Sequence, residues 1–368
     1  MLLSSMRVIG IDPGTISIDL CGLADGHVFL DATIPTHDAL ADPAFLIDHI
    51  ASQQPLDCIV GPSGYGLPLT RAADLTEDAI RLALLSRPGG AGGIGGLGRL
   101  LRALASSSLP VMLTPGVIHL PSVPDSRKVN RIDMGTADKV CVAALAIHDQ
   151  SVRRGWRPSE SSFILLELGG AFTAGLAISN GSIVDGIGGS SGALGARACG
   201  ALDAEVAVLA GHVSKDLVFA GGAATVAGRD HLETAALAHP HSARERLARD
   251  AFLEGGIKTV LSLLAALPRP AEIVLSGRMA EGAAVFEALS ARLQWIAPVR
   301  QLRGISAASK AAAQGAALLA DGLAGGAHAP LVEALRIREA RGSVFDHLYV
   351  LEPSAARRSL FADNTRPR

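Results

Sequence analysis

The sequence contains few aromatic residues and few cysteines. Aromatic residues make up 4% of the 368 residues and hydrophobic residues 49%, so aliphatic side chains must fill most of the cores. The cysteines are widely spaced and form neither a CxxC pair nor a pairing with histidine: Cys21, Cys58, Cys141 and Cys199. We therefore expect buried free thiols, and neither a zinc site nor a disulfide framework.

The sequence also lacks a strong net charge and a long apolar segment. A formal charge of −2 argues against nucleic acid or an acidic membrane surface as an obligatory partner. No window approaches the roughly 18 unbroken apolar residues of a membrane-spanning helix. The opening MLLSS has neither the charged region nor the long apolar region of a signal peptide. We therefore expect a cytoplasmic protein that binds neither membrane nor nucleic acid.

Residues 8–31, VIGIDPGTISIDLCGLADGHVFLD, predict a three-stranded antiparallel meander. Short apolar runs are separated by Pro-Gly and Asp-Gly pairs, which are typical of tight turns. The first turn carries a carboxylate, a small flexible residue and two hydroxyls, which are Asp12, Gly14, Thr15 and Ser17. Such groups hold hydrated Mg²⁺ and phosphate oxygens, because a small residue lets backbone amides approach the anion.

Residues 163–186 repeat this pattern at a constant offset of 155. Glu167 then matches Asp12, and the pair Gly169-Gly170 follows at the position of Gly14. An internal repeat of a long unit predicts two similar folds, and two turns of this kind would converge on one cleft and bring backbone amides onto phosphate. The alternative is that any two β-hairpins look alike, which leaves the ungapped offset unexplained.

Two further segments supply candidates for a substrate pocket. Loop 61–68 follows a buried strand, and its candidates are Ser63 and Tyr65, with a plain turn as the alternative. Polar residues also gather just before and at the start of a helix that Thr136 is expected to cap: Asn130, Arg131, Asp133 and Asp138. The alternative for these four is a capped helix entry with solvated charges.

The second half of the chain adds two glycine turns. Loop 186–192 requires unusual backbone angles, and Arg197 after it is a candidate anion clamp. A strand at 273–275 ends in a tight turn, where Gly277 would let a flat ring such as adenine lie against the backbone. Gly277 and Arg278 are therefore candidates for nucleotide binding.

Several further segments predict how the chain is divided into loops, helices and lobes. Residues 87–100, RPGGAGGIGGLGRL, predict a mobile loop or lid. A phosphate-binding loop is the alternative, but no strand precedes these residues and no GK[ST] closes them. Residues 217–222 predict a strand, and residues 231–267 a mostly helical segment with a break at 254–258. The helix after Thr136 and a second helix at 306–319 are rich in small residues, so we expect them to pack closely together between two lobes.

The order of these parts resembles the superfamily of acetate and sugar kinases, heat-shock ATPases and actin. VIGIDPGTIS looks like the first phosphate motif, LELGGAFTAGLAISNGSIVD like the second, and IVLSGRMA like the adenosine motif. WIAPV followed by the GAALL helix is similar to the carboxyl-terminal segment. The resemblance covers about residues 7 to 325 and is strongest to butyrate kinase and the family of predicted butyrate kinases.

This resemblance implies an α/β fold with two ribonuclease-H-like, actin-like ATPase lobes around a nucleotide cleft. Residues 1–150, with 306–368 packing back on them, would form the N-terminal lobe, and residues 151–305 the C-terminal lobe. The implied activity is an ATP- and Mg²⁺-dependent phosphotransferase of the acyl-kinase type that acts on a small carboxylate or a related small metabolite. A homodimer is left open as its assembly.

The resemblance also implies roles for single residues. Asp12 would hold Mg²⁺, Thr15 and Ser17 would bind terminal phosphate oxygens, and Arg197 or Arg131 would stabilise the transferring charge. The chain departs from butyrate kinases where Pro62-Ser63 replaces an arginine, and where Ile132–Gly135 replaces a His-Ala-Leu-Asn motif. The alternative is a nucleotide-gated binding or assembly protein of the same fold with a non-carboxylate partner.

Overall fold

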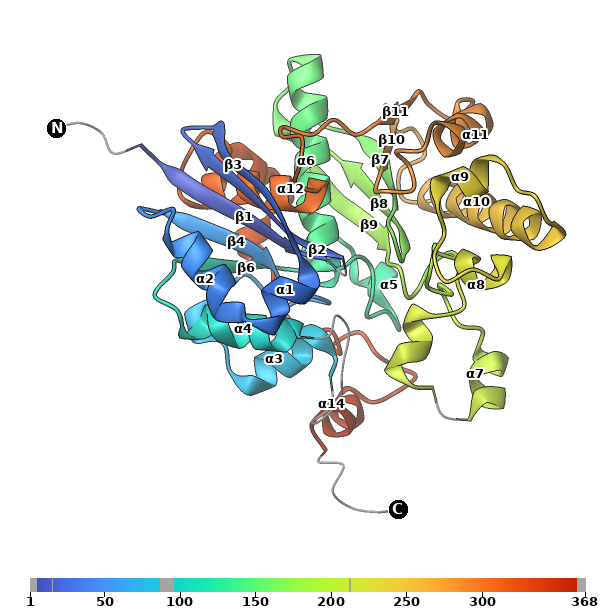
Figure 1. Ribbon diagram of the computed structural model, residues 1–368, viewed down its shortest axis with the longest axis horizontal. Coiled ribbons are helices and arrows are strands. Elements are labelled where there is room, and N and C mark those ends of the chain that lie inside the picture. The colour runs from blue at the N-terminus through green and yellow to red at the C-terminus, as the bar shows by residue number, and fades with distance from the viewer. Residues whose placement is uncertain (1–4, 15, 87–95, 212, 363–368) are drawn as a thin grey trace. The chain divides into compact units, whose positions relative to one another are not determined.

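A computed structural model describes residues 5–14, 16–86, 96–211 and 213–362 (Figure 1). The chain divides into two compact units, and each has its own β-sheet and its own hydrophobic core. Unit 1 comprises Met1–Ile132, Thr136–Ser159 and Gly304–Arg368, and unit 2 comprises Asp133–Gly135 and Glu160–Arg303. Most of the predicted glycine-rich lid, residues 87–95, lies outside the described residues.

Unit 1 is built on a mixed six-stranded sheet with the strand order β3-β2-β1-β4-β6-β5. β2 pairs antiparallel with β1 and β3, whereas β4 runs parallel to β1 and β6. The strands are β1 Arg7–Pro13, β2 Ser17–Ala24, β3 His27–Pro35, β4 Cys58–Pro62, β5 Thr70–Arg71 and β6 Val111–Thr114. β1, β2 and β4 are almost wholly buried, as expected for central strands covered on both faces.

Nine described helices and three short 3₁₀ helices belong to unit 1. The α-helices are α1 Thr36–Ala41, α2 Pro43–Ala51, α3 Glu77–Leu84, α4 Leu97–Ser106, α5 Asp125–Lys128, α6 Ala137–Arg154, α12 Ala311–Leu323, α13 Ala329–Leu335 and α14 Pro353–Phe361. The 3₁₀ helices are η1 Ala72–Asp74, η2 Val117–His119 and η5 Ile337–Glu339. A further 3₁₀ helix, η3 Pro158–Glu160, leads from unit 1 into unit 2.

α12 packs closely against both β1 and α6. A Cβ atom added to Gly10 of β1 would lie 2.1 Å from the carbonyl oxygen of Ala313. A Cβ atom added to Gly315 would lie 1.8 Å from the carbonyl oxygen of Cys141 in α6. Both glycines therefore let two backbones approach to a distance that a side chain would prevent. The predicted pairing of the two small-residue helices is confirmed, and both helices belong to unit 1.

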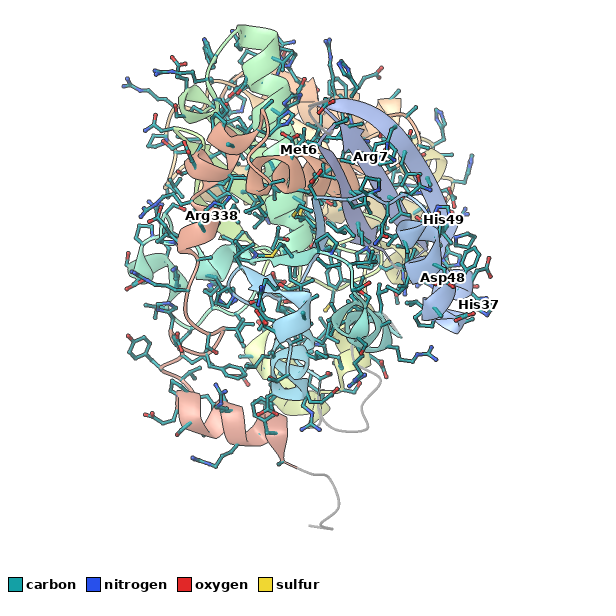
Figure 2. All side chains as sticks on the ribbon, turned by 90° about the vertical axis from the view of Figure 1, so that its left-hand side faces the viewer. Met6, Arg7, His37, Asp48, His49 and Arg338 are labelled. Atoms are coloured by element: carbon teal, nitrogen blue, oxygen red, sulfur yellow. The ribbon has the colours of Figure 1, made fainter. Side chains whose placement is uncertain are left out.

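Arg7 fixes the amino-terminal end of β1. Its side chain is labelled in Figure 2. Its guanidinium carbon lies 3.9 Å from the ring centroid of Phe29 on β3. Its backbone N–H donates to Asp57 Oδ2 at 2.8 Å, just before β4 begins. These contacts anchor β1 to the chain on both of its sides, at the end opposite to Asp12.

Unit 2 contains a five-stranded sheet with the order β11-β10-β7-β8-β9. The strands are β7 Phe163–Leu168, β8 Thr173–Ser179, β9 Ser182–Ile187, β10 Ile273–Ser276 and β11 Val299–Gln301. Its described helices are α7 Ala204–Ala210, η4 Lys215–Phe219, α8 Ala223–Ala227, α9 Thr234–Ala238, α10 Ala243–Leu263 and α11 Ala283–Leu293.

The meanders β1–β3 and β7–β9 are the same unit twice, as the sequence repeat predicts. Ile9 pairs with Gly22 between β1 and β2, and Ile164 pairs with Ala177 between β7 and β8. The pairing of β2 with β3 shifts after Gly22, and that of β8 with β9 shifts after Ala177. The register and the β-bulge therefore both recur at the offset of 155.

The tight turns of the two meanders recur as well. Asp25-Gly26 and Asn180-Gly181 both have positive φ angles, which the favoured two-residue hairpin turns require. The two meanders lie in separate sheets, and each is continued by a parallel strand, β4 beside β1 and β10 beside β7. The predicted mixed α/β class with two similar halves is confirmed.

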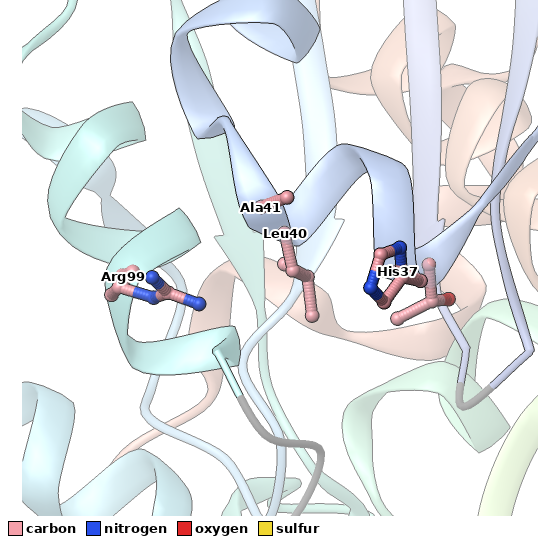
Figure 3. A pocket seen from close by; sticks show the side chains of 5 residues that line it. His37, Leu40, Ala41 and Arg99 are labelled. Atoms are coloured by element: carbon pink, nitrogen blue, oxygen red, sulfur yellow. The ribbon is translucent and has the colours of Figure 1, made fainter.

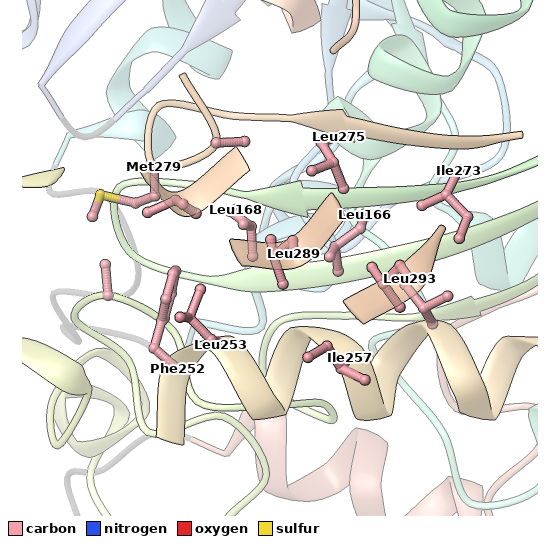
Figure 4. Packing of buried hydrophobic residues seen from close by; sticks show 14 of the residues in the cluster. Leu166, Leu168, Phe252, Leu253, Ile257, Ile273, Leu275, Met279, Leu289 and Leu293 are labelled. Atoms are coloured by element: carbon pink, nitrogen blue, oxygen red, sulfur yellow. The ribbon is translucent and has the colours of Figure 1, made fainter. Parts of the chain in front are cut away.

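α10 is continuous where the sequence predicts a break at 254–258. A Cβ atom on Gly255 would lie 3.0 Å from the Cβ of Ala193, and one on Gly256 would lie 3.3 Å from Leu166 Cδ2. The glycines therefore allow the helix to lie close to its neighbours, and they do not interrupt it. The core of unit 2 forms there, with Phe252 of α10 packed among the buried leucines of the sheet (Figure 4).

The predicted strand at 217–222 is wrong. Lys215–Phe219 form the 3₁₀ helix η4, and Gly221 makes an isolated bridge to Ala198. The ring of Phe219 packs edge-on against Phe172 with 5.2 Å between centroids. The apolar residues of this run are half-buried beside the β7–β8 hairpin, so their hydrophobicity serves that contact and does not place them in a sheet.

We predict that Gly10→Ala lowers the free energy of unfolding by about 1–3 kcal/mol or more, because overpacking forces the backbones of β1 and α12 apart. Gly61→Ala in the adjacent strand β4 is the matched control, since its Cβ would meet no atom closer than 3.9 Å. Urea unfolding of the two variants measures the difference, and equal losses would contradict the close packing of α12.

Candidate active site

Asp12 lies near the carboxyl end of β1, where α/β sheets commonly place binding residues. It stands opposite Asp19 of β2 in the antiparallel register. Asp12 is only 8% exposed, and its carboxylate forms no hydrogen bond or ion pair with the part of the chain that the structure describes. Burial without such partners is unfavourable for a carboxylate, because desolvation penalises its charge.

The surroundings of Asp12 set its protonation. Desolvation by burial raises the pKa of Asp12 to about 7, the negative charge of Asp138 adds to this effect, and the ammonium groups of Lys310 and Lys139 oppose it. Burial also raises the pKa of Asp138, but Lys139, 2.7 Å from Asp138 Oδ2, and a hydrogen bond from Thr136 bring that pKa below its usual value. Of the two carboxyl groups, Asp12 is therefore the one whose protonation changes near neutral pH.

Thr136 occupies the predicted N-cap position of α6, but its hydroxyl has a different partner. It donates to Asp138 Oδ1 and accepts no backbone N–H. This contact helps to hold the Asp138 carboxylate at the first turn of α6, where the helix dipole favours negative charge. Thr136 and the predicted candidate Asp138 thus form one hydrogen-bonded pair at the start of α6.

Ser17, Asp19 and Lys310 form a second hydrogen-bonded group in unit 1. Lys310 Nζ donates to Ser17 Oγ at 2.5 Å and lies 2.8 Å from Asp19 Oδ2. Ser17 Oγ donates to the same oxygen of Asp19 at 2.8 Å. Asp19 and Ser17 are buried, whereas 46% of the Lys310 side chain is exposed. The cation is therefore accessible to solvent although its partners are not.

Gly14 brings the first turn next to this cation. Its backbone N–H donates to the carbonyl of Ser17 at 2.9 Å, and its carbonyl accepts a hydrogen bond from Thr36 Oγ1 at 2.7 Å. A Cβ atom on Gly14 would lie 2.8 Å from Lys310 Nζ. Thr15, the predicted phosphate ligand beside it, lies outside the described residues.

Lys310 and Asp19 are the residues that the sequence did not reveal as candidates. Lys310 is the only charged residue in SAASKAAAQGAALL, and it directly precedes α12. Its position as a single charged residue at the start of a buried helix could have identified it as a candidate. Asp19 alternates with apolar neighbours in β2, as a solvent-facing strand residue would, although it is 1% exposed.

The predicted nucleotide residues of unit 2 come together at one hairpin. The N–H of Gly169 donates to the carbonyl of Phe172 at 2.9 Å, which closes the turn between β7 and β8. Gly277 has a φ of 89°, and a Cβ atom there would lie 2.5 Å from the carbonyl oxygen of Leu168. A Cβ atom on Gly170 would meet nothing within 4 Å. Arg278 is exposed and has only a loose contact of 3.8 Å with Glu233.

Arg197 is attached to the same hairpin of unit 2. Its backbone N–H donates to the carbonyl of Ala171 at 3.0 Å, and its carbonyl accepts the N–H of Gly222 at 2.8 Å. The side chain is half-buried and makes no hydrogen bond or ion pair with any residue in the described ranges. Its charge is therefore available for a ligand.

Asp133 holds the glycine-rich loop of unit 2 in place. Its Oδ2 accepts the N–H and the hydroxyl of Ser190 at 2.9 and 2.8 Å. Its backbone carbonyl accepts the Ser191 hydroxyl at 2.5 Å. The carboxylate is 7% exposed, so these contacts use most of its capacity as an acceptor. Loop 188–191 thereby acquires a fixed conformation despite its glycines.

Two other predicted substrate residues use their polar groups within unit 1. Ser63 is fully buried, and its hydroxyl donates to the carbonyl of Thr114 at 2.7 Å. The side-chain oxygen of Asn130 accepts the N–H groups of Tyr349 and Val350 at 2.7 and 2.9 Å. Both side chains thus connect segments that are distant in sequence.

Tyr65 and Arg131, the other two candidates, are half-buried and exposed, respectively.

A hollow of about 230 Å³ lies between α1 and α4 of unit 1 (Figure 3). It is lined by Thr36, His37, Leu40, Ala41 and Arg99. Because Thr36 also bonds to Gly14, this hollow adjoins the first turn.

All four cysteines are free, as predicted, although Cys199 is only partly buried. Among the residues described, no three or more His, Cys, Asp or Glu side chains are grouped so as to hold a metal ion. Within the same residues no helix is both long enough and apolar enough to cross a membrane.

The fold is shared with short-chain acid kinases of known structure. Acetate kinase from Entamoeba histolytica is 14% identical, with 78% of this chain and 86% of that chain covered at a TM-score of 0.59. Acetate kinase from Porphyromonas gingivalis is 15% identical, with 79% and 88% covered at 0.57. A propionate kinase from Francisella tularensis is 12% identical, with 84% and 98% covered at 0.58. This likeness shows that the chain has the two-lobed actin-like ATPase fold, and at these identities it shows the fold alone.

The chain belongs to the family described as "Protein of unknown function (DUF1464)", whose model matches residues 10–350. The match includes most of the first meander, the whole of the second and the helix that follows Lys310. No curated protein matches the chain.

We predict that Asp12→Asn stabilises the protein in metal-free buffer at pH 8. Because burial raises the pKa of Asp12 to about 7, the unfolded chain releases a proton between about pH 4 and 7 that the folded chain retains. The carboxylate therefore lowers stability as the pH rises through this window. The gain is up to roughly 4 kcal/mol, since a tenfold change in an equilibrium is worth about 1.4 kcal/mol.

Urea unfolding at pH 4 and pH 8 with a chelator present measures this effect. Other titrating groups contribute equally to both proteins, so the difference between them isolates Asp12. The advantage of the variant should be small at pH 4 and largest at pH 8. The same difference at both pH values would show that Asp12 has an ordinary pKa.

Proposed function

We propose that the protein is an ATP- and Mg²⁺-dependent phosphotransferase. The observation that carries this proposal is the buried carboxylate of Asp12, without a partner among the described residues, in the fold of acetate and propionate kinases. In-line phosphoryl transfer depends mainly on positioning and on neutralisation of charge. A buried carboxylate without a partner of its own, near the ammonium groups of Lys310 and Lys139, supports this chemistry.

The residues around Asp12 fit a magnesium ion. Magnesium usually binds through one or two carboxylates together with waters and substrate phosphates. Asp12 and Asp138 interact electrostatically, and a divalent cation would relieve both the desolvation of Asp12 and the repulsion between the two groups. When bound, the ion would neutralise phosphate charge during transfer.

Protein groups would bind the rest of the nucleotide. In unit 1, we assign the first turn to phosphate: the Ser17 hydroxyl, which now donates to Asp19, would turn to a phosphate oxygen. In unit 2, we assign the Gly169-Gly170 turn to phosphate, with the amide of Gly170 as the donor because the N–H of Gly169 donates to the carbonyl of Phe172, and we assign the turn at Gly277 to the adenosine. Each assignment rests on contacts within its own unit and can be tested separately.

For the acceptor we propose a small carboxylate, with butyrate as the first candidate from the sequence. An acyl kinase must bring two anions together, and two unit charges about 4 Å apart repel by roughly 4 kcal/mol at an effective dielectric near 20. We assign Arg197 first to offset this repulsion, because its side chain is half-buried and has no partner in the described chain. Arg131, which is exposed, is the second candidate.

Mg²⁺-ATP should raise the melting temperature of the wild type, because a ligand that binds only the native state stabilises it by mass action, about 2.7 kcal/mol at 100 times Kd. Asp12→Asn should lose the magnesium-dependent part of this shift and keep the part seen with ATP alone. Asp48→Asn, at an exposed carboxylate on α2, is the matched control and should behave as the wild type. A full magnesium-dependent shift in Asp12→Asn would remove Asp12 from the metal site.

Incubation with ATP, Mg²⁺ and butyrate or another short carboxylate should form an acyl phosphate that hydroxylamine traps. Arg197→Ala should lower its rate of formation by about 100-fold or more, the scale for losing a charge-stabilising group. Arg246→Ala on the exposed face of α10 is the control and should leave the rate unchanged. Nucleotide binding without acyl phosphate from any short carboxylate would reject the acid-kinase assignment and leave the phosphotransferase open for other acceptors.

A further inference from the structure

We infer that Lys310 is a phosphate-binding residue whose ammonium contacts the terminal phosphate oxygens of the bound nucleotide, and that Asp19 positions it. This inference rests on the proposed phosphotransferase function and adds a residue to its site. It starts from the observation that Lys310 Nζ lies within hydrogen-bonding distance of both Ser17 and Asp19 at the first turn.

The segment before Lys310 is held by an unusual concentration of hydrogen bonds. Asp31 of β3 accepts the successive backbone N–H groups of Ala307, Ala308 and Ser309 at 3.0, 2.8 and 2.7 Å. Gln314 of α12 accepts the N–H of Ile305 at 2.6 Å and so closes the same loop from the other side. The sheet and the helix together fix the backbone that carries Lys310. Such preorganisation is what a residue that binds charge requires.

Asp19 is fully used as an acceptor within unit 1. Its Oδ1 accepts the hydroxyl of Thr33 at 2.8 Å, and its Oδ2 accepts Ser17 and lies 2.8 Å from Lys310 Nζ. Since the residue is 1% exposed, it is shielded from any ligand. We therefore assign Asp19 the role of orienting Lys310, which makes it a positioning residue.

Lys310 differs from the other lysine near Asp12. The side chain of Lys139 is 15% exposed and pairs with Asp138, whereas that of Lys310 is 46% exposed. The ammonium of Lys310 also lies where a Cβ atom on Gly14 would be 2.8 Å away, so it adjoins the turn assigned to phosphate. Of these two cations, Lys310 is the one that an incoming anion can reach without leaving a buried carboxylate unpaired.

To bind phosphate, the Lys310 ammonium would need only to exchange one hydrogen-bond partner. The ammonium has three donors, and one of them now contacts the Ser17 hydroxyl. This donor would turn to a phosphate oxygen while the contact with Asp19 is kept. A charge-assisted hydrogen bond of this kind corresponds to an affinity change of about 10- to 100-fold.

The test must avoid leaving Asp19 buried and unpaired, because Lys310→Met alone would destabilise the fold. We therefore compare Asp19→Asn with the double variant Asp19→Asn/Lys310→Met, which removes both charges. Lys258→Met, at an exposed lysine of α10, controls for the loss of a surface charge. Binding of ATP, tripolyphosphate and adenosine is measured by calorimetry, and Lys310 is probed by pulsed acetylation and mass spectrometry.

We expect ATP and tripolyphosphate, but not adenosine, to protect Lys310 from acetylation in the wild type. The double variant should bind tripolyphosphate about 10- to 100-fold more weakly than Asp19→Asn, and Lys258→Met should bind as the wild type does. If ATP binds but Lys310 is not protected and the double variant binds equally well, Lys310 is not a phosphate ligand while the proposed function stands. If tripolyphosphate protects Lys310 but ATP does not bind, the residue is an anion site and the nucleotide function fails. If neither ligand binds the wild type, both proposals are overturned.

Discussion

The close approach of α12 to β1 and α6 is the constraint on which the arrangement of unit 1 depends. Gly10 and Gly315 allow backbone separations that no side chain would permit, so α12 has one position and one rotation. Successive residues of an α-helix are about 100° apart around its axis, since one turn takes about 3.6 residues. A shift of α12 by a single residue would therefore carry Lys310 away from Ser17. Packing in the core thus determines the chemistry at the helix end.

Two carboxylates that face each other across one strand pair have opposite environments. Asp19 has a hydroxyl, a second hydroxyl and an ammonium as partners, so its burial is compensated. Asp12 is almost as buried and has no such partner within the described residues, so its pKa rises to about 7. An uncompensated buried charge lowers stability, and under the proposed function a bound cation would recover this cost.

Periodic and repeated features of the sequence were sufficient for much of the fold. The offset of 155 predicted the two meanders, and the small-residue helices predicted the pairing of α6 with α12. Glycine was harder to interpret, because the same residue can break a helix or bring it close to a neighbour. Gly255 and Gly256 bring α10 close to its neighbours, and only the positions of Ala193 and Leu166 in the structure reveal this.

Candidate residues were harder still, because a polar side chain near a turn can serve the fold or a ligand. Ser63, Asn130 and Asp133 looked like candidates for a ligand, yet their polar groups connect distant segments of the chain. Lys310 is far from Asp19 in sequence, and nothing in the local pattern connects them. Their contact depends on the rotation of α12, which is a property of tertiary packing.

Because the two meanders share one register, equivalent positions in the same chain can be compared directly. Each position of β7–β9 has a defined counterpart in β1–β3, with the same pairing partner and the same bulge. Asp12 has an acidic counterpart in Glu167, but Ser17 and Asp19 correspond to Phe172 and Ala174. If the two copies descend from one duplicated ancestor, they have diverged in side chains while keeping one backbone geometry. Individual residues could therefore be exchanged between the copies without altering the length of either, and such exchanges would show which side chains distinguish the turn beside Ser17 and Asp19 from its counterpart in unit 2.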